Sequence, residues 1–193
     1  MRRFKRNPRH KREEGRFRDL SNFDIGLLVY DMEENLYFIL IDPNSKKLDI
    51  KGVMKTEYID DRTQMICCLN YGYGYSPVLF EAAMSYMYEN DEFLLGGSEA
   101  RAKLLFNYDN FDESKFTTKT RKAWEKFLIN AQQNNLINLD IELGFSLKEP
   151  VNGLESSLER GVLFLESYAK FSHQSIETMN QRIIDDAEDY LNE

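Results

Sequence analysis

The hydrophobic pattern of this chain changes once, close to Gly74, and that change constrains the fold more than any other feature. Before it, apolar residues stand in short runs or alternate with polar ones, which is typical of β-strands. After it, they recur every three or four residues, which is typical of amphipathic helices. Strands followed by helices, without regular alternation of the two, predict an α+β fold.

The first part of the chain predicts strands joined by turns. Segments rich in β-branched, leucine and aromatic residues are expected to be strands at 25–31, 36–42 and 64–69. A fourth strand begins where Leu48 and Ile50 alternate with polar residues, and its pattern becomes less regular up to Ile59. Residues 32–35 suit a hairpin loop, and the Asp-Pro-Asn-Ser sequence at 42–45 is a strong turn signal.

Everything after Gly74 is expected to be mainly helical. Ser76 suits the N-cap and Pro77 the first position of one helix. A second helix is expected at 117–134, with one apolar face made of Ala123, Trp124, Phe127, Leu128 and Ala131. Between the two, 98–105 predicts a short helix and 107–114 a polar loop, while 136–143 predicts a return to a strand.

The end of the chain predicts a separate helical unit. Pro150 and Gly153 mark a boundary, and between residues 154 and 190 apolar side chains follow a three-four rhythm. Residues 172–175 interrupt it, so two helices are expected, packed on the sheet domain or on a partner. The predicted organisation is a basic arm (1–20), an α+β domain (21–149) and an amphipathic helical tail (150–193).

Charge separates these parts. Residues 1–20 carry nine basic and three acidic side chains, a net charge of +6, whereas the other 173 residues carry −14. Such an arm favours an acidic protein surface or the phosphates of a nucleic acid. Binding to a duplex is the weaker hypothesis, because the acidic body would be repelled. A solvated terminus without a partner is the third.

Composition excludes several kinds of site. The adjacent Cys67 and Cys68 cannot build a disulfide framework or a zinc knuckle, and we expect them to be buried core residues rather than nucleophiles. His10 and His173 are too few for a histidine-built metal centre, so no metal site is predicted. No apolar run approaches the roughly 18 residues of a membrane helix, and no secretory signal follows Met1. A reducing cytoplasm, or a particle assembled there, is the expected setting.

The segment 69–77 carries the chemistry, because it joins a predicted strand to a predicted helix through glycines. A turn of this kind presents free backbone N–H groups and the positive end of a helix dipole, which together bind phosphate. It is not a P-loop, since no Gly-Lys-Ser/Thr follows, and its spacing differs from the Rossmann fingerprint. A tight turn rich in glycine and tyrosine, without a ligand, is the alternative.

The sequence from Gly74 to Ala83 resembles the coenzyme A loop of the GNAT superfamily of acyl-CoA-dependent N-acetyltransferases. There the pattern Gln/Arg-x-x-Gly-x-Gly/Ala closes a strand and opens a helix, and here Tyr71, Gly74 and Ser76 stand at its three fixed positions. Gly96-Gly97 and the segment up to Trp124 add a similarity to the GNAT-like proteins of tailed bacteriophages. The resemblance covers residues 24–145 and implies a mixed, mainly antiparallel sheet with packed helices.

The resemblance also implies a set of site residues. Acetyl-CoA would be the cofactor, bound by Leu69, Tyr71, Gly72, Gly74, Tyr75 and Ser76. A carboxylate removes a proton from the attacking amine, for which Glu57, Asp60 and Asp61 are candidates, and Tyr108 is the candidate acid for the thiolate. Plain surface or loop roles are the alternative for each of them.

Two functions follow from the resemblance. The first is a phage-encoded acyl-CoA-dependent N-acetyltransferase-like protein in the host cytoplasm. The second is a catalytically silent GNAT-like component of the virion or of its assembly, docking on phage structural proteins or on further copies of itself through the arm and the tail. Two features favour the second function. Tyr71 stands where the superfamily pattern has Gln or Arg and Ser76 where it has Gly or Ala, and the strand and two helices that begin a full GNAT domain are not found before Ile25. The preserved order of strand, loop and helix favours the first.

Overall fold

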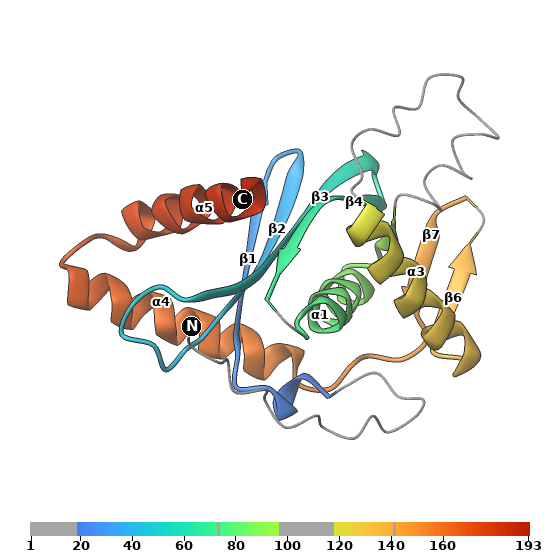
Figure 1. Ribbon diagram of the computed structural model, residues 1–193, viewed down its shortest axis with the longest axis horizontal. Coiled ribbons are helices and arrows are strands. Elements are labelled where there is room, and N and C mark those ends of the chain that lie inside the picture. The colour runs from blue at the N-terminus through green and yellow to red at the C-terminus, as the bar shows by residue number, and fades with distance from the viewer. Residues whose placement is uncertain (1–18, 73, 97–117, 141) are drawn as a thin grey trace, which may run out of the picture.

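The computed structural model describes residues 19–72, 74–96, 118–140 and 142–193 (Figure 1). Its strands are β1 (Gly26–Met32), β2 (Asn35–Ile41), β3 (Ile50–Asp60), β4 (Thr63–Tyr71), β5 (Phe93–Leu95), β6 (Ile137–Asp140) and β7 (Gly144–Leu147). Its helices are α1 (Ser76–Glu89), α3 (Thr118–Gln133), α4 (Leu154–Ser172) and α5 (Ile176–Asn192), with a 3-10 turn, η1, at Leu20–Asn22. The fold is therefore α+β, as the sequence predicts.

The strands form one sheet in the order β1-β2-β3-β4-β5-β7-β6. Neighbours are antiparallel throughout except for β4 and β5, which run parallel. A parallel pair needs a crossover, and α1 supplies it, because this helix leaves the end of β4 and leads back to the start of β5. The mixed, mainly antiparallel sheet expected from the sequence is confirmed.

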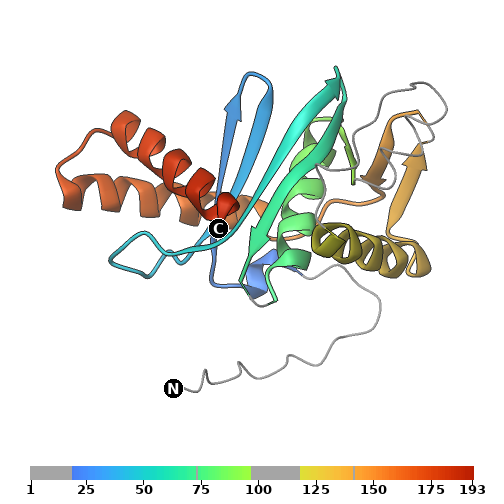
Figure 2. The same cartoon turned by 45° about the horizontal axis from the view of Figure 1, so that its top comes forward.

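Helices cover both faces of the sheet, and β2 shows how the sequence directs this. Alternate side chains of a strand point to opposite faces. Leu36, Phe38 and Leu40 belong to the core under α1 and α3, whereas Tyr37, Ile39 and Ile41 belong to the core under α4 and α5. Figures 1 and 2 show the same division, with α4 and α5 on one side of β1–β3 and α1 on the other. An unbroken apolar run is what a strand buried on both faces requires.

The helical tail is therefore a layer of the fold. Met179, Ile183 and Ala187 of α5 are fully buried against the sheet, which confirms that the predicted stripe packs on the sheet domain. α4 approaches β1 so closely that a Cβ on Gly161 would lie 2.3 Å from the carbonyl oxygen of Leu27. Arg160 adds hydrogen bonds to the carbonyl oxygens of Phe23 (3.1 Å) and Ile25 (2.7 Å). α4 thus packs tightly against this edge of the sheet.

The arm and the body meet earlier than residue 20. Leu20, which the sequence analysis counted with the arm, has no exposed surface and belongs to the core. Its backbone N–H donates to the Asn152 carbonyl oxygen at 2.9 Å, just before α4. Gly153 fits there only because it has no side chain, since a Cβ would stand 2.2 Å from the Ser21 nitrogen. Residues 19 and 20 are thus tied to the start of α4.

Several predicted element boundaries are wrong, each for a local reason. The irregular stretch up to Ile59 is part of one eleven-residue strand, β3, whose pairing with β4 absorbs the irregularity as register shifts. β5 and β7 interrupt the part expected to be helical, because strands of three and four residues are too short to show a period. The strand expected at 136–143 is β6 alone. The helix at 98–105 and the loop at 107–114 lie outside the described residues.

The N-terminus of α1 also differs from the prediction. Tyr75 occupies the N-cap position and makes no side-chain cap, while Ser76 is the first helical residue and Pro77 the second. Proline still fits, because the first turn of a helix has no intrahelical acceptor for its N–H groups. The apolar face predicted for the second helix is confirmed, with Trp124, Leu128 and Ala131 buried.

Candidate functional site

The turn from β4 to α1 is held by backbone hydrogen bonds on its inner side. The Gly72 N–H donates to the Lys51 carbonyl oxygen at 2.8 Å, and the Tyr75 N–H donates to the Gly72 carbonyl oxygen at 3.3 Å. Gly74, between them, has φ +87°, a conformation that favours glycine. It is exposed, and a Cβ built on it would meet no atom of the described residues within 4 Å, its chain neighbours aside. Among the described residues, the outer side of the turn is therefore open.

Only some amides of this turn are available as donors. Pro77 has no N–H, the Tyr75 N–H is bonded within the turn, and the Tyr71 N–H donates to the Asn70 side-chain oxygen at 2.9 Å. Ser76 and Val78 are both in the first turn of α1, where no intrahelical carbonyl can satisfy their N–H groups, but Val78 has no exposed surface and only Ser76 is partly exposed. The Ser76 amide and the positive end of the helix dipole therefore lie beside Gly74.

Tyrosine rings line the inner side of the turn. Tyr71 and Tyr75 are half-buried and pack against the core under α1. A Cβ on Gly72 would lie 3.4 Å from the Lys51 carbonyl oxygen and 3.6 Å from the Tyr75 ring, which are ordinary van der Waals distances, so packing alone does not require a glycine at this position. The position of Tyr73 lies outside the described residues.

The strand that leads into the turn leaves its parallel neighbour halfway. β4 pairs with β5 only from Thr63 opposite Phe93 to Met65 opposite Leu95. Residues 66–71 of β4 continue with β3 on one side and with no described strand on the other. The N–H groups of successive residues in an antiparallel strand point to alternate sides. Since the Gly72 N–H points to β3, the Tyr71 and Leu69 N–H groups point to the unpaired side of β4.

A register shift marks the middle of β4. Lys55 of β3 stands opposite Cys68 and Thr56 stands opposite Ile66, so Cys67 is the extra residue of a β-bulge. Bulges bend a strand and re-aim its groups, and they are common beside active sites. Here the bulge lies where β4 leaves β5.

The structure brings one candidate base to this bulge and not the other two. Glu57 lies beside it, with its Oε2 accepting from the Cys67 Sγ at 3.3 Å. Asp60 ends β3 and Asp61 lies in the turn that follows, at the far end of β4 from Gly74, and the Asp60 carboxylate accepts the Arg62 N–H at 3.1 Å. Nine strand residues of about 3.3 Å each separate that turn from the glycine turn. Tyr108 lies outside the described residues.

Cys67, at the bulge, is a poor nucleophile. Burial, followed by the hydrogen bond to Glu57, raises the pKa of Cys67 to about 12, so this side chain is a thiol at neutral pH. Cys68 is exposed, which corrects the expectation that both are buried. The bulge is the reason, because it shifts the alternation of the strand by one residue.

A buried polar network, which sequence reasoning missed, fixes the point where β4 and β5 meet. Glu92, just before β5, accepts hydrogen bonds from the Tyr58 hydroxyl (3.2 Å) and the Gln64 amide (3.4 Å), and Gln64 accepts one from the Thr56 hydroxyl (2.8 Å). Burial raises the pKa of Glu92 above its ordinary value and that of Tyr58 to about 12. Polar residues inside two predicted strands were the only signal in the sequence.

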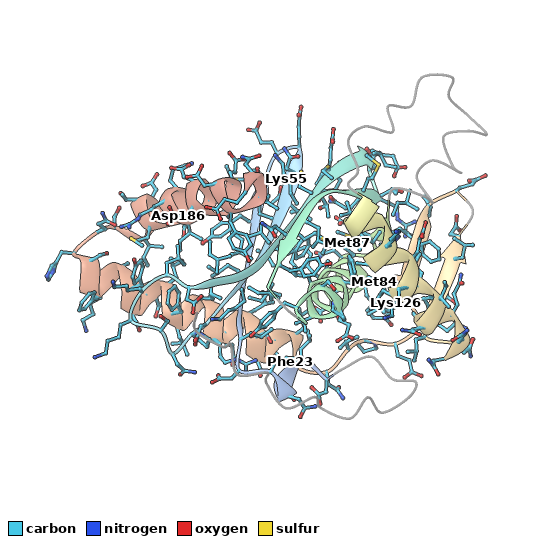
Figure 3. All side chains as sticks on the ribbon, in the orientation of Figure 1. Phe23, Lys55, Met84, Met87, Lys126 and Asp186 are labelled. Carbon is cyan, nitrogen blue, oxygen red and sulfur yellow. The ribbon has the colours of Figure 1, made fainter. Side chains whose placement is uncertain are left out.

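The end of α5 contacts the strands beside the site. Tyr37 donates to Glu188 at 2.5 Å, and Lys55 pairs with the same carboxylate at 3.8 Å while lying over the Tyr37 ring. Figure 3 shows Lys55 next to the C-terminal end of α5. The Asn70 side chain donates to the Tyr190 carbonyl oxygen. The tail thus contacts β4 directly before the glycine turn.

The described residues contain neither a metal-binding cluster nor a membrane-spanning helix. No group of three or more histidine, cysteine, aspartate or glutamate side chains is arranged to hold a metal ion. Of the described helices, none is long and apolar enough to cross a membrane.

The comparisons with known proteins add no name to this geometry. No known protein family matches the chain, and no curated protein matches it either. The case for a function therefore depends on the residues along β4 and at the turn into α1.

Proposed function

We propose that this protein is a phage-encoded, GNAT-like acyl-CoA-dependent N-acetyltransferase that acts in the host cytoplasm. One observation carries the proposal: β4 continues past Leu95, where its parallel neighbour β5 ends, and enters α1 through a turn where a Cβ on Gly74 would meet no described residue within 4 Å apart from its chain neighbours. This arrangement supports the resemblance of residues 69–83, because a coenzyme A loop of that superfamily closes a strand and opens a helix.

The residues present fit acetyl-CoA at the turn. The Ser76 amide and hydroxyl would hold the pyrophosphate, at the positive end of α1 and beside Gly74. Tyr71, Gly72 and Tyr75 shape the turn without donating to the ligand, since the amides of all three are already bonded. When bound, the cofactor supplies a thioester that an amine can attack.

The chemistry would take place at the bulge. The Leu69 amide, on the unpaired side of β4, is the backbone donor placed to polarise the acyl carbonyl. Glu57 would accept the proton that the amine loses when its nitrogen forms the new bond to carbon and the carbon–sulfur bond breaks. Tyr108 is kept by resemblance alone as the group that returns a proton to sulfur.

A silent assembly component is the second candidate, and a specific observation favours it. The Tyr71 and Tyr75 amides are bonded within the protein, and the Asn70 side chain is bonded to the end of α5, so these residues are held in place without a ligand. As an assembly component, the protein would dock on an acidic component of the virion through its basic arm. Deletion of residues 2–18 would then abolish co-purification with that component while the melting temperature stays unchanged.

Ligand-induced stabilisation tests the first proposal. A ligand at about 100 times its Kd stabilises the folded state by about 2.7 kcal/mol, so millimolar coenzyme A is expected to raise the melting temperature by several degrees. Gly74→Asn is expected to abolish the rise. Asparagine tolerates a positive φ, so the turn is kept while its side chain occupies the space beside the helix end.

The matched control is Glu33→Asn. Glu33 also has a positive φ, but it lies in the turn between β1 and β2, away from the site, and this variant is expected to keep the rise. An unchanged melting temperature of the natural protein at millimolar coenzyme A would exclude the enzyme reading and leave the assembly component.

A further inference from the structure

α4 exposes apolar side chains on the surface that faces away from the sheet. Leu163 is 61% exposed and Phe171 is 75% exposed, although α4 buries its other face in the core. The two residues stand eight positions apart, with Ser167 midway, so all three follow one i, i+4 ridge of the helix. Two large apolar residues thus flank a small one, about 12 Å apart along the axis.

A hollow of about 500 Å³ runs beside this ridge. Its first wall is α4 and its second is the loop between β2 and β3, at 43–46, which Figure 1 shows next to α4. The lining residues are Asp24, Pro43, Asn44, Ser45, Lys46, Arg160, Leu163, Phe164, Ser167, Tyr168 and Phe171. Leu163 and Phe164 line it with apolar surface next to Arg160, and Phe171 lines it further along α4.

The neighbouring ridge of α4 carries charges of opposite sign. Val162, Glu166 and Lys170 follow each other at four-residue spacing, and Glu166 and Lys170 are exposed. If two copies of α4 packed in parallel, each charge would face its own copy and be repelled. In an antiparallel pair centred on Ser167, Glu166 of each copy lies two positions along the axis from Lys170 of the other copy and two positions from that copy's Glu166, so two attractive pairs face one repulsive pair.

The geometry points to a dimer in which the α4 helices of two copies pack antiparallel across a two-fold axis at Ser167. Phe171 of one copy enters the hollow beside Leu163 of the other, and the second copy repeats the contact. The hollow extends along α4 from Leu163 past Ser167 to Phe171, so a two-fold axis at Ser167 brings the Phe171 end of each copy to the Leu163 end of the other, and an isologous interface uses the same surface on both copies in this way. The loop wall takes part too, because a stable interface buries about 800 Å² on each partner, more than a single helix ridge offers.

Charge argues against the basic arm as the occupant of the same hollow. Lys46 and Arg160 line it and Asp24 is its single acidic residue. An arm with a net charge of +6 would be repelled there, whereas a second α4 brings Glu166 and an apolar ring. The acidic residues of α5, not this hollow, are the surface that such an arm would seek on electrostatic grounds.

Sedimentation of the full chain over a range of concentrations tests the dimer. We expect a monomer–dimer equilibrium, and Phe171→Asp should raise its dissociation constant by more than about 30-fold, because each interface loses two buried anchors. Phe171 contributes little to the monomer, so the melting temperature of the diluted variant should stay unchanged. The matched control is Ile129→Asp on α3, where an equally apolar residue is 54% exposed on another surface, and it should leave the equilibrium unaltered.

Charge exchange tests the antiparallel arrangement, and it does so even if Phe171→Asp fails to fold. Glu166→Lys and Lys170→Glu alone should each weaken the dimer about fivefold, and the double variant should restore it. Ser167→Cys should cross-link two copies on oxidation, whereas the natural protein, with its exposed Cys68, should not under the same conditions.

Three results would overturn the inference. The first is a monomer at all concentrations, and the second is a dimer that Phe171→Asp leaves intact. The third is a dimer that disappears when residues 2–18 are deleted, which would make the arm the occupant. If the double charge variant dimerises no more tightly than the two single variants, the antiparallel arrangement is refuted.

Discussion

The two halves of β4 differ in what surrounds them. The paired half, residues 63–65, has β3 on one side and β5 on the other, and the network around Glu92 ties all three strands together. The open half, residues 66–71, has β3 alone among the described strands and ends in the glycine turn. One strand therefore combines a rigid base with an accessible edge, so changes in the paired half should cost stability and changes in the open half should cost function.

The two glycines that follow these halves show the same contrast. Gly96 comes directly after β5, and a Cβ on it would lie 1.8 Å from the Trp124 ring. Gly74 comes after the open half, and a Cβ there would meet none of the described residues within 4 Å apart from its chain neighbours. Gly96 is required by packing and Gly74 by its backbone angle. Only the second leaves room for a ligand.

The largest effect is expected for Gly96→Ala. Trp124 is 1% exposed and held between aromatic rings, with its centroid 5.0 Å from that of Phe80, so it cannot move aside. Overpacking at such a site is expected to cost about 3 kcal/mol of unfolding free energy, measured by urea denaturation. A cost below about 1 kcal/mol would show that the end of β5 is not fixed by Trp124.

Glu57→Gln should act on function alone. Removal of the base is expected to lower acetyl transfer by about 100-fold, measured with an amine acceptor and acetyl-CoA. Glu57 is exposed, so the unfolding free energy should change by less than about 0.5 kcal/mol, and stabilisation by coenzyme A should persist. Asp61→Asn, in the turn at the other end of β4, is the control and should retain full transfer. Equal losses in both variants would place the chemistry elsewhere.

Gln64→Leu should destabilise the paired half. The substitution leaves the buried Thr56 hydroxyl and the Glu92 carboxylate without their shared partner, at an expected cost of about 2 kcal/mol. Thr63→Val is the matched control on the same strand. The Thr63 hydroxyl is buried and has no hydrogen-bond partner among the described residues, so valine should be neutral or stabilise by up to about 1 kcal/mol. The opposite order of the two costs would refute the role of the network.

The contrast also explains what could be predicted from the sequence. The unbroken apolar run of β2 and the three-four rhythm of α4 and α5 reflect burial that each residue experiences locally, so pattern alone identified them. β5 consists of three residues, and its place beside β4 depends on a crossover that no local period encodes. The cap of α1 was misplaced by one residue, because proline fits either of the first two positions.

The candidate site divides in the same way. Its glycines were identified because a turn between a strand and a helix leaves a compositional signal. Glu57 was one of three nearby carboxylates, and only the bulge at Cys67 distinguishes it. Glu92 was missed entirely, since its partners come from two other strands. Long-range pairing, rather than composition, decides which carboxylate lies where.

The smallest effect expected is the pH dependence contributed by Glu92. Burial raises the pKa of this carboxyl in the folded protein. Between its ordinary value and the raised one, the folded protein keeps a proton that the unfolded chain has lost, so stability falls as the pH rises through this range. Glu92→Gln has no such proton. As the pH rises from mildly acidic to neutral, the unfolding free energy of the natural protein should therefore fall relative to that of Glu92→Gln. A difference that stays constant with pH would mean that the carboxyl is hydrated, and that the paired half of β4 is less closed than its hydrogen bonds indicate.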